Sequence, residues 1–413
     1  EKADGILAGG NTQGGAIYNG YGTITFDALA TFEGNSVTAT GGSSHGGAIH
    51  NYGASAVLTF NDEAQFKNNT TTATATEKAD GTLAGGNSYG GAIYNGYGTI
   101  TFDALATFEG NSATATGGVS QGGAIGNSGY MNFTDEALFE GNEASNQGGA
   151  IYNNGTITFG ELATFESNTV DKGVKSDAYG GAIANYKNIT FKEKAIFKNN
   201  EAKAVASAVG GAIFHHDGTI TFEKGFEFVG NKIINDGKVS NNDIIIYSNA
   251  VLNLGTENST STADELMAEG GITSYHTTSV INKYSLGNFI LRTENSSSNN
   301  RGFAGIFNQY AGTTIADSDK FFNGTNNITG GELRVHGASL ANLKASVSNG
   351  AMLTYLTTRT ERQNVALGTN VSVIGANVTF GAYEGVEQAQ YTLGSDIASD
   401  ARALKVIIQD SNI

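Results

Sequence analysis

The chain has no cysteine, no proline and no tryptophan among its 413 residues. Without cysteine it has no disulfide framework, no thiolate metal site and no cysteine nucleophile. Proline lacks a backbone N–H and interrupts central strands, so its absence favours a backbone in which nearly every N–H enters a hydrogen-bonded ladder. No run of about 20 apolar residues occurs, and no segment is therefore expected to span a membrane as a helix.

Charge is scarce and unbalanced, with 39 acidic residues against 23 basic ones and a net charge of −16. An excess of this sign repels nucleic acid and anionic membrane surfaces, so neither is an expected partner. The low charge and the 58 glycines also argue against a helical protein. The 22 phenylalanines and 17 tyrosines supply most of the large apolar volume. We expect a thin, repetitive core.

What the sequence does contain is a short repeat. The tetrapeptide GGAI occurs seven times, and Phe-x-x-Asn (FxxN) follows each copy after 17 to 20 residues. Between the two lies a third β-favouring run, of which GTITF at residues 22–26 is typical. The copies of GGAI begin at Gly14, Gly46, Gly90, Gly122, Gly148, Gly180 and Gly210, and those of FxxN at Phe32, Phe66, Phe108, Phe139, Phe165, Phe197 and Phe228.

Three short strands in about 22 residues, repeated, predict one coil of a stacked solenoid. We interpret the chain as an all-β, right-handed, three-sided parallel β-helix of about 15 coils, in which each strand pairs with its counterpart one coil away. Residues 1–240 carry the GGAI/FxxN repeats, and residues 241–413 continue as degenerate coils with longer loops. Residues 1–42 and 77–118 agree at 38 of 42 positions, which indicates duplication of a modular stack.

Stacking assigns a structural role to each repeated residue. Ile17, Ile49 and Ile93 begin one inward column, Phe26 begins a second, and the FxxN phenylalanines form a third. The double glycine, such as Gly14 and Gly15, permits a tight corner. Asparagine amides can bond their neighbours above and below. One such ladder is expected from Asn35, Asn69, Asn111, Asn142, Asn168, Asn200 and Asn231, and a second from Asn19, Asn51, Asn95, Asn127, Asn153 and Asn185, with His215 in the seventh place.

Other segments are predicted to lie outside this regular stack. The variable stretches between FxxN and the next GGAI, such as residues 70–89, are interpreted as loops along one edge, either a binding surface or tolerated insertions. Residues 261–271 resemble a short helix capped by Thr262 and Glu265. A second helix is expected at residues 394–405. The threonine-rich run at residues 70–76 suggests an ice-binding face, but such a face needs threonine ladders in successive coils, and the run does not repeat.

No catalytic, cofactor-binding or metal-binding residue is expected. Most acidic residues recur with the repeat, whereas catalysis needs a unique pair held across one cleft. The group at residues 316–320 is interpreted as a solvated turn. His215 and His216 are adjacent on a strand and point to opposite faces, so one ion cannot readily bind both. A glycan-active enzyme, a lyase or hydrolase, is the least favoured alternative.

One outward stripe is a candidate binding surface. Because each follows the inward isoleucine, Tyr18, Tyr94, Tyr152 and Phe214 should point outward along one face, and Tyr89 is a further candidate. The same place holds His50, Gly126 and Ala184, which interrupt the stripe. Scattered exposed rings are also ordinary on protein surfaces, so both interpretations stay open.

The paired tetrapeptides over residues 14–231 resemble the repeats of polymorphic outer-membrane proteins first recognised in chlamydiae. That resemblance implies an autotransporter passenger at the bacterial cell surface, attached to the outer membrane or secreted. It also implies adhesion to a host-cell or matrix receptor, protein or glycan, often with self-association. A self-assembling filament or surface coat is the alternative function.

Overall fold

A computed structural model describes residues 10–77, 81–171, 177–259, 265–291, 302–316, 323–336, 343–356, 364–366, 371–381, 390–392 and 405–408. Within these ranges every regular element is a β-strand. The chain divides into two compact units. The first comprises Glu1–Ile220 and Phe228–Ile245, and the second Thr221–Glu227 and Ile246–Ile413.

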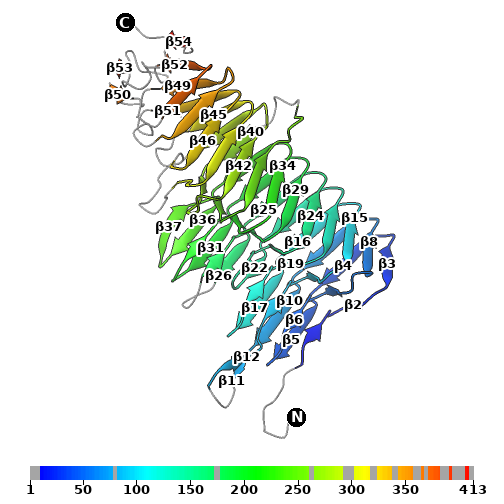
Figure 1. Cartoon of the computed structure of the whole chain (residues 1–413). Coiled ribbons are helices and arrows are strands. Elements are labelled where there is room, and N and C mark those ends of the chain that lie inside the picture. The colour runs from blue at the N-terminus through cyan, green and yellow to red at the C-terminus, as the bar shows by residue number, and fades with distance from the viewer. Residues whose placement is uncertain are drawn as a thin grey trace. The chain divides into compact units, whose positions relative to one another are not determined.

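The first unit is a parallel β-helix, as the repeat predicts. Successive coils place equivalent strands side by side in parallel sheets (Figure 1). The GGAI tetrapeptide leads into the sheet that we call the GGAI sheet. This sheet includes β2 (Ile17–Asn19), β7 (Ile49–Asn51), β14 (Ile93–Asn95), β19 (Ile125–Asn127), β23 (Ile151–Asn153), β28 (Ile183–Asn185), β33 (Ile213–His215) and β38 (Ile244–Ile246).

The second and third runs of each repeat form two further sheets, the ITF sheet and the FxxN sheet. The ITF sheet contains β3 (Thr23–Phe26), β8 (Val57–Phe60), β15 (Thr99–Phe102), β20 (Tyr130–Phe133), β24 (Thr156–Phe159), β29 (Asn188–Phe191) and β34 (Thr219–Phe222). The FxxN sheet contains β4 (Ala30–Glu33), β9 (Ala64–Lys67), β16 (Ala106–Glu109), β21 (Ala137–Glu140), β25 (Ala163–Glu166), β30 (Ala195–Lys198) and β35 (Phe226–Val229).

The core consists of stacked side chains in register. Ile93 pairs with Ile49 on one side and Ile125 on the other. Phe102 stacks on Phe133 of the next coil with ring centroids 4.8 Å apart, and Phe108 stacks on Phe139 at the same spacing. The two phenylalanine columns meet edge to face inside the coil. Offset stacking along a column and edge-to-face contact across it are the preferred arrangements of aromatic rings.

The two glycines of GGAI have different structural roles. The first, Gly90 for example, has a φ of +61°, which a side chain rarely adopts. The second, Gly91, has no room for a Cβ, because the carbonyl oxygen of Gly123 in the next coil lies where that atom would be. The same contact joins Gly47 to Gly91. The corner can therefore close only where both residues are glycine.

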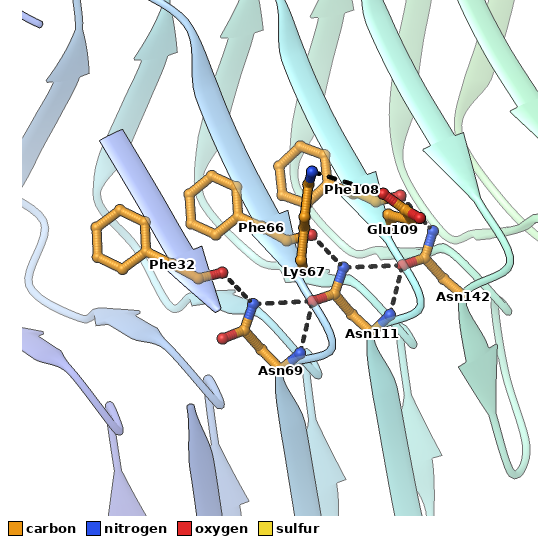
Figure 2. A network of polar contacts seen from close by, with 8 residues as sticks. All are labelled: Phe32, Phe66, Lys67, Asn69, Phe108, Glu109, Asn111 and Asn142. Atoms are coloured by element: carbon orange, nitrogen blue, oxygen red, sulfur yellow. Dashed lines mark hydrogen bonds and ion pairs between the residues drawn. The ribbon is translucent and has the colours of Figure 1, made fainter. Parts of the chain in front are cut away.

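The asparagines of FxxN form a continuous ladder that is buried from Asn69 onward, and Figure 2 shows Asn69, Asn111 and Asn142 of this ladder. The amide nitrogen of Asn111 donates to the side-chain oxygen of Asn142 at 2.9 Å and to the carbonyl oxygen of Phe66 at 2.9 Å. Its own side-chain oxygen accepts from the amide and the backbone N–H of Asn69, both at 3.0 Å. From Asn69 to Asn231 each side-chain amide thus donates two hydrogen bonds and accepts two, which satisfies a buried amide. At the last coil Asn231 donates to the carboxylate of Asp243 at 3.0 Å.

A second ladder follows the GGAI sheet. Asn51 donates to the side-chain oxygen of Asn95 at 3.0 Å, and Asn95 to that of Asn127 at 2.9 Å. The ladder reaches Asn185, whose amide lies 3.1 Å from Nδ1 of His215. His215 is fully buried there, in the place of a seventh asparagine.

The segments after FxxN are strands, which corrects the prediction that they are loops. They form a parallel sheet that we call the side sheet, with one antiparallel strand, β37, at its end. Its strands are β5 (Ser36–Thr40), β10 (Thr70–Thr74), β17 (Ser112–Thr116), β22 (Glu143–Ala144), β26 (Thr169–Asp171), β31 (Glu201–Ala204), β36 (Lys232–Asn235) and β37 (Lys238–Asn241). The threonine-rich run at residues 70–76 does have counterparts in neighbouring coils, so the statement that it does not repeat was wrong.

Short return strands lead from the side sheet back to GGAI. They are β1 (Thr12–Gln13), β6 (Ser44–His45), β13 (Ser88–Tyr89), β18 (Ser120–Gln121), β27 (Ala178–Tyr179) and β32 (Ala208–Val209). A small antiparallel pair, β11 (Thr76–Glu77) and β12 (Leu83–Ala84), extends one connection. Small side chains such as Ala144, Val170 and Ala202 pack together as a separate core between these layers. These segments form strands because small inward residues alternate with polar outward residues along them.

The second unit also consists of parallel ladders. One contains β39 (Val251–Leu254), β42 (Val280–Lys283), β44 (Ile306–Gln309), β46 (Thr325–Ile328), β48 (Ala345–Ser348) and β51 (Val371–Ile374). The other contains β40 (Glu265–Ala268), β43 (Asn288–Leu291), β45 (Thr313–Ala316), β47 (Glu332–His336), β49 (Met352–Leu356), β52 (Asn377–Gly381) and β54 (Lys405–Ile408). The remaining strands are β41 (Ile272–Thr273), β50 (Asn364–Ala366) and β53 (Gln390–Thr392).

The helix predicted at residues 261–271 is wrong where the structure describes it. Glu265–Ala268 is strand β40, and Leu266 and Ala268 are completely buried with the period of two expected of a strand. Stacking against β43 decides the conformation, because it gives these residues a ladder that an isolated capping signal cannot offer. Thr262 and residues 317–320 lie outside the described part. So do residues 394–404 of the other predicted helix, while Lys405 begins β54.

Candidate binding face

Aromatic side chains gather on the outward side of the GGAI sheet, next to the inward isoleucines. Parallel pairing sets Tyr18 beside His50 and His50 beside Tyr94. The register continues through Gly126, Tyr152, Ala184 and Phe214. The parallel register therefore brings residues 26 to 44 positions apart onto one face.

In the first coils these rings form one connected cluster, which we call the aromatic face. His50 lies at its centre, with ring centroids 5.3 Å from Tyr18, 5.1 Å from Tyr94 and 5.4 Å from Tyr52. Tyr52 in turn contacts Tyr97 at 5.8 Å. The sequence interpretation that His50 interrupts the stripe is therefore corrected, because its imidazole ring links the neighbouring tyrosines.

The return strands complete the cluster from the side. His45 stacks on His50 with centroids 5.3 Å apart, and on Tyr89 at 4.9 Å. Tyr89 also contacts Tyr94 at 5.4 Å. The candidate Tyr89 thus joins the stripe from another sheet, which spacing within GGAI could not reveal.

Burial favours the uncharged forms of His45, His50, Tyr89 and Tyr94. His50 is 1 % exposed, and neither of its ring nitrogens has a hydrogen-bond partner. Burial, with a smaller contribution from the charge of His45, lowers the pKa of His50 to about 3. Burial raises the pKa of Tyr94 to about 12. The face therefore offers apolar rings and neutral hydroxyls to a partner.

A second aromatic group lies further along the same sheet. Tyr152 contacts Tyr186 at 5.3 Å, and Phe214 contacts Tyr179 at 4.7 Å and Tyr186 at 5.9 Å. Phe214 is only 2 % exposed, so the expectation that it is an outward contact residue is corrected: its neighbours cover it. Between the groups stands Gly126, where a Cβ would lie 3.1 Å from the ring of Tyr94.

The exposed fraction of each ring distinguishes the residues that a partner can contact from those that pack beneath them. Tyr18, Tyr52 and Tyr97 are 51 %, 40 % and 60 % exposed, whereas Tyr94, Tyr152 and Tyr89 are half-buried. Of the five candidates taken from the sequence, Tyr18 is therefore the most accessible. Sequence reasoning missed Tyr52 and Tyr97, although both stand at the turn that follows a ladder asparagine, in NYG and NGYG.

No group of three or more metal-ligating side chains occurs in the part of the chain that the structure describes. The recurring acidic residues, such as Glu109 and Glu140, stand side by side on the solvent side of the FxxN sheet. Among the described residues no helix is long and apolar enough to cross a membrane.

Residues 136–154, which contain the FxxN tetrapeptide at Phe139 and the GGAI tetrapeptide at Gly148, match the model of the Chlamydia polymorphic membrane protein repeat. Those residues carry one copy of this repeat. The curated proteins gave no match, and neither did the solved structures. The aromatic face lies on the coils that begin with the first three GGAI tetrapeptides, at Gly14, Gly46 and Gly90.

Proposed function

We propose that this protein is a surface adhesin, the passenger of an autotransporter-type protein, which is attached to the outer membrane or secreted. The polymorphic membrane protein repeat supports a location at the bacterial surface. The proposed partner is a host-cell or matrix receptor. A self-assembling filament is the alternative that the same experiment can distinguish.

The aromatic face carries the proposal. Tyr18, Tyr52 and Tyr97 expose large parts of their rings around the buried His50. Aromatic residues are enriched at protein interfaces, because one ring combines a large apolar area with a polar tip. Their neighbours already hold these rings in place, so binding would cost little additional side-chain entropy.

The chemistry of the face suggests the kind of receptor. It is neutral near pH 7, whereas the whole chain carries a charge of −16. Stacking rings and phenolic hydroxyls suit the apolar face and hydroxyl groups of a neutral sugar, or an apolar patch on a protein. A strongly anionic glycan would be repelled by the rest of the surface.

The test is attachment of protein-coated beads to cultured epithelial cells. A Tyr52→Ala/Tyr97→Ala variant should lower attachment several-fold, because it removes two exposed rings without touching the inward core. Tyr130→Ala is the matched control, since Tyr130 is 63 % exposed but lies on the ITF sheet.

The outcomes separate the hypotheses. Equal attachment of the wild type and the double variant would exclude the aromatic face as the contact surface. Beads that clump with one another but do not attach to cells would favour self-assembly. Attachment no greater than that of bare beads would contradict adhesion to these cells.

A further inference from the structure

Nine hydroxyl-bearing side chains form an uninterrupted array on the outward face of the side sheet. The array occupies three consecutive coils, on β5, β10 and β17. Pairing is in register on both sides of β10. The columns are Ser36–Thr70–Ser112, Thr38–Thr72–Thr114 and Thr40–Thr74–Thr116, and we call this set the hydroxyl array.

The array is regular in two directions. Paired strands lie about 4.8 Å apart, and alternate residues along one strand lie about 6.6 Å apart. The hydroxyl of Thr70 donates to that of Ser36 at 3.0 Å, which links two coils of the first column. Threonine is stiff at χ1, so its methyl and hydroxyl groups are held in fixed directions. Ala39 and Ala73 lie buried beneath and support the sheet.

Neither duplication nor strand propensity accounts for the array. β5 and β17 belong to the two nearly identical segments, 1–42 and 77–118, but β10 lies between them and carries the same pattern independently. Further along the same sheet, charged residues take the outward positions instead. Lys203 pairs with Asp171 at 2.9 Å, and Lys232 with Glu201 at 3.0 Å.

A neutral array that repeats in two directions matches a neutral ligand that repeats in two directions. A charged ligand would be bound by charged side chains. On the outward face of the side sheet such side chains occur only after the third coil, on β22 and β26. Each threonine offers a hydroxyl that both donates and accepts, beside a methyl group that orders nearby water. On the prism face of ice, water oxygens repeat at a distance close to the separation of paired strands. Water bound along the columns could therefore continue into the ice lattice.

We propose that the hydroxyl array binds the surface of ice crystals. The proposal does not depend on the adhesin function, because the array lies on the side sheet and the aromatic face on the GGAI sheet. Because the hydroxyl groups are neutral, binding would not require a charged group to lose its water. The free energies of many weak contacts along one face add together.

The test uses the purified 413-residue chain and measures two quantities, thermal hysteresis and the fraction of protein incorporated into slowly growing ice. The wild type should show both. Thr72→Tyr puts a large ring at the centre of the array and should reduce both several-fold. Thr107→Tyr is the matched control, because Thr107 points outward and is half-buried on β16 of the FxxN sheet. It should behave as the wild type.

A second pair, Thr72→Lys and Thr107→Lys, repeats the comparison with a charge in place of a ring. Far-UV circular dichroism and thermal unfolding show that each variant is folded before it is compared. Absence of hysteresis and of incorporation into ice for the folded wild type would overturn the proposal. Equal activity of the folded Thr72 and Thr107 variants would overturn the assignment to this array.

Discussion

The amide of Asn111 donates to the side-chain oxygen of Asn142, 2.9 Å away and 31 residues along the chain. This bond is one step of a ladder that runs through all seven FxxN copies. Because an asparagine such as Asn111 is hydrogen-bonded to the asparagines of both neighbouring coils, its substitution should reduce the stability of those coils as well as its own.

We expect Asn111→Asp to destabilise the first unit by about 3 kcal/mol. A carboxylate of the same shape cannot donate to Asn142 or Phe66, and each buried group that loses its partner costs about 1–3 kcal/mol. Urea unfolding followed by circular dichroism measures the effect. Glu109→Gln is the control, because Glu109 ends strand β16 two residues before Asn111 and its side chain is exposed. A shift no larger than that of the control would show that the ladder contributes little.

The second glycine of GGAI should tolerate no side chain. In Gly91→Ala the new Cβ would collide with the backbone oxygen of Gly123, and backbone cannot rotate away as a side chain can. We expect loss of the folded protein or a large fall in its melting temperature. Gly20→Ala is the comparison, because a Cβ there meets only the side chain of Tyr18, at 3.4 Å. Similar melting temperatures for the two variants would contradict this close approach.

Acid should destabilise the protein through His50. The pKa of His50 falls from 6.5 in the unfolded chain to about 3 in the folded one, so the unfolded state binds the extra proton between these values. The stability that the neutral ring provides is complete above pH 6.5 and is lost progressively as the pH falls towards 3. At pH 5 the loss amounts to about 2 kcal/mol.

Replacing His50 with tyrosine, as at Tyr18 and Tyr94 in the same column, removes this titration. The free energy of unfolding of His50→Tyr should therefore fall less between pH 7 and pH 5 than that of the wild type. Denaturant titrations at the two pH values measure the difference. An equal fall in both proteins would assign the acid sensitivity to other groups.

In the second unit Lys283 should be essential for stability. It is completely buried, and its ammonium group donates to the carbonyl oxygens of Ser285, Gly287 and Ala311 at 2.7, 3.0 and 3.0 Å. Lys283→Met keeps the length of the chain but leaves these oxygens without that donor. We expect a loss of about 3 kcal/mol in urea unfolding.

Lys344→Met serves as the control for the lysine charge, because Lys344 is exposed in the same unit. A loss for Lys283→Met as small as for Lys344→Met would show that water or rearrangement satisfies the carbonyl groups.

The sequence by itself determined the parallel β-helix and the identity of its inward columns. A hydrogen-bonded ladder between coils forces equivalent residues into register, so Ile93, Phe108 and Asn111 can be assigned from spacing alone. Such periodic positions depend only on the repeat, and the repeat is written in the sequence.

Only the tertiary structure decided what lies between the periodic positions. The spacers vary in length, so their pairing could not be read from a fixed period, and the side sheet with its hydroxyl array was not predicted. Tyr89 and His45 reach His50 and Tyr94 from other strands, which alternation along one strand cannot reveal. At Glu265–Ala268 the neighbouring coil overrode a local helix signal, because burial of Leu266 in the stack outweighs a capping preference.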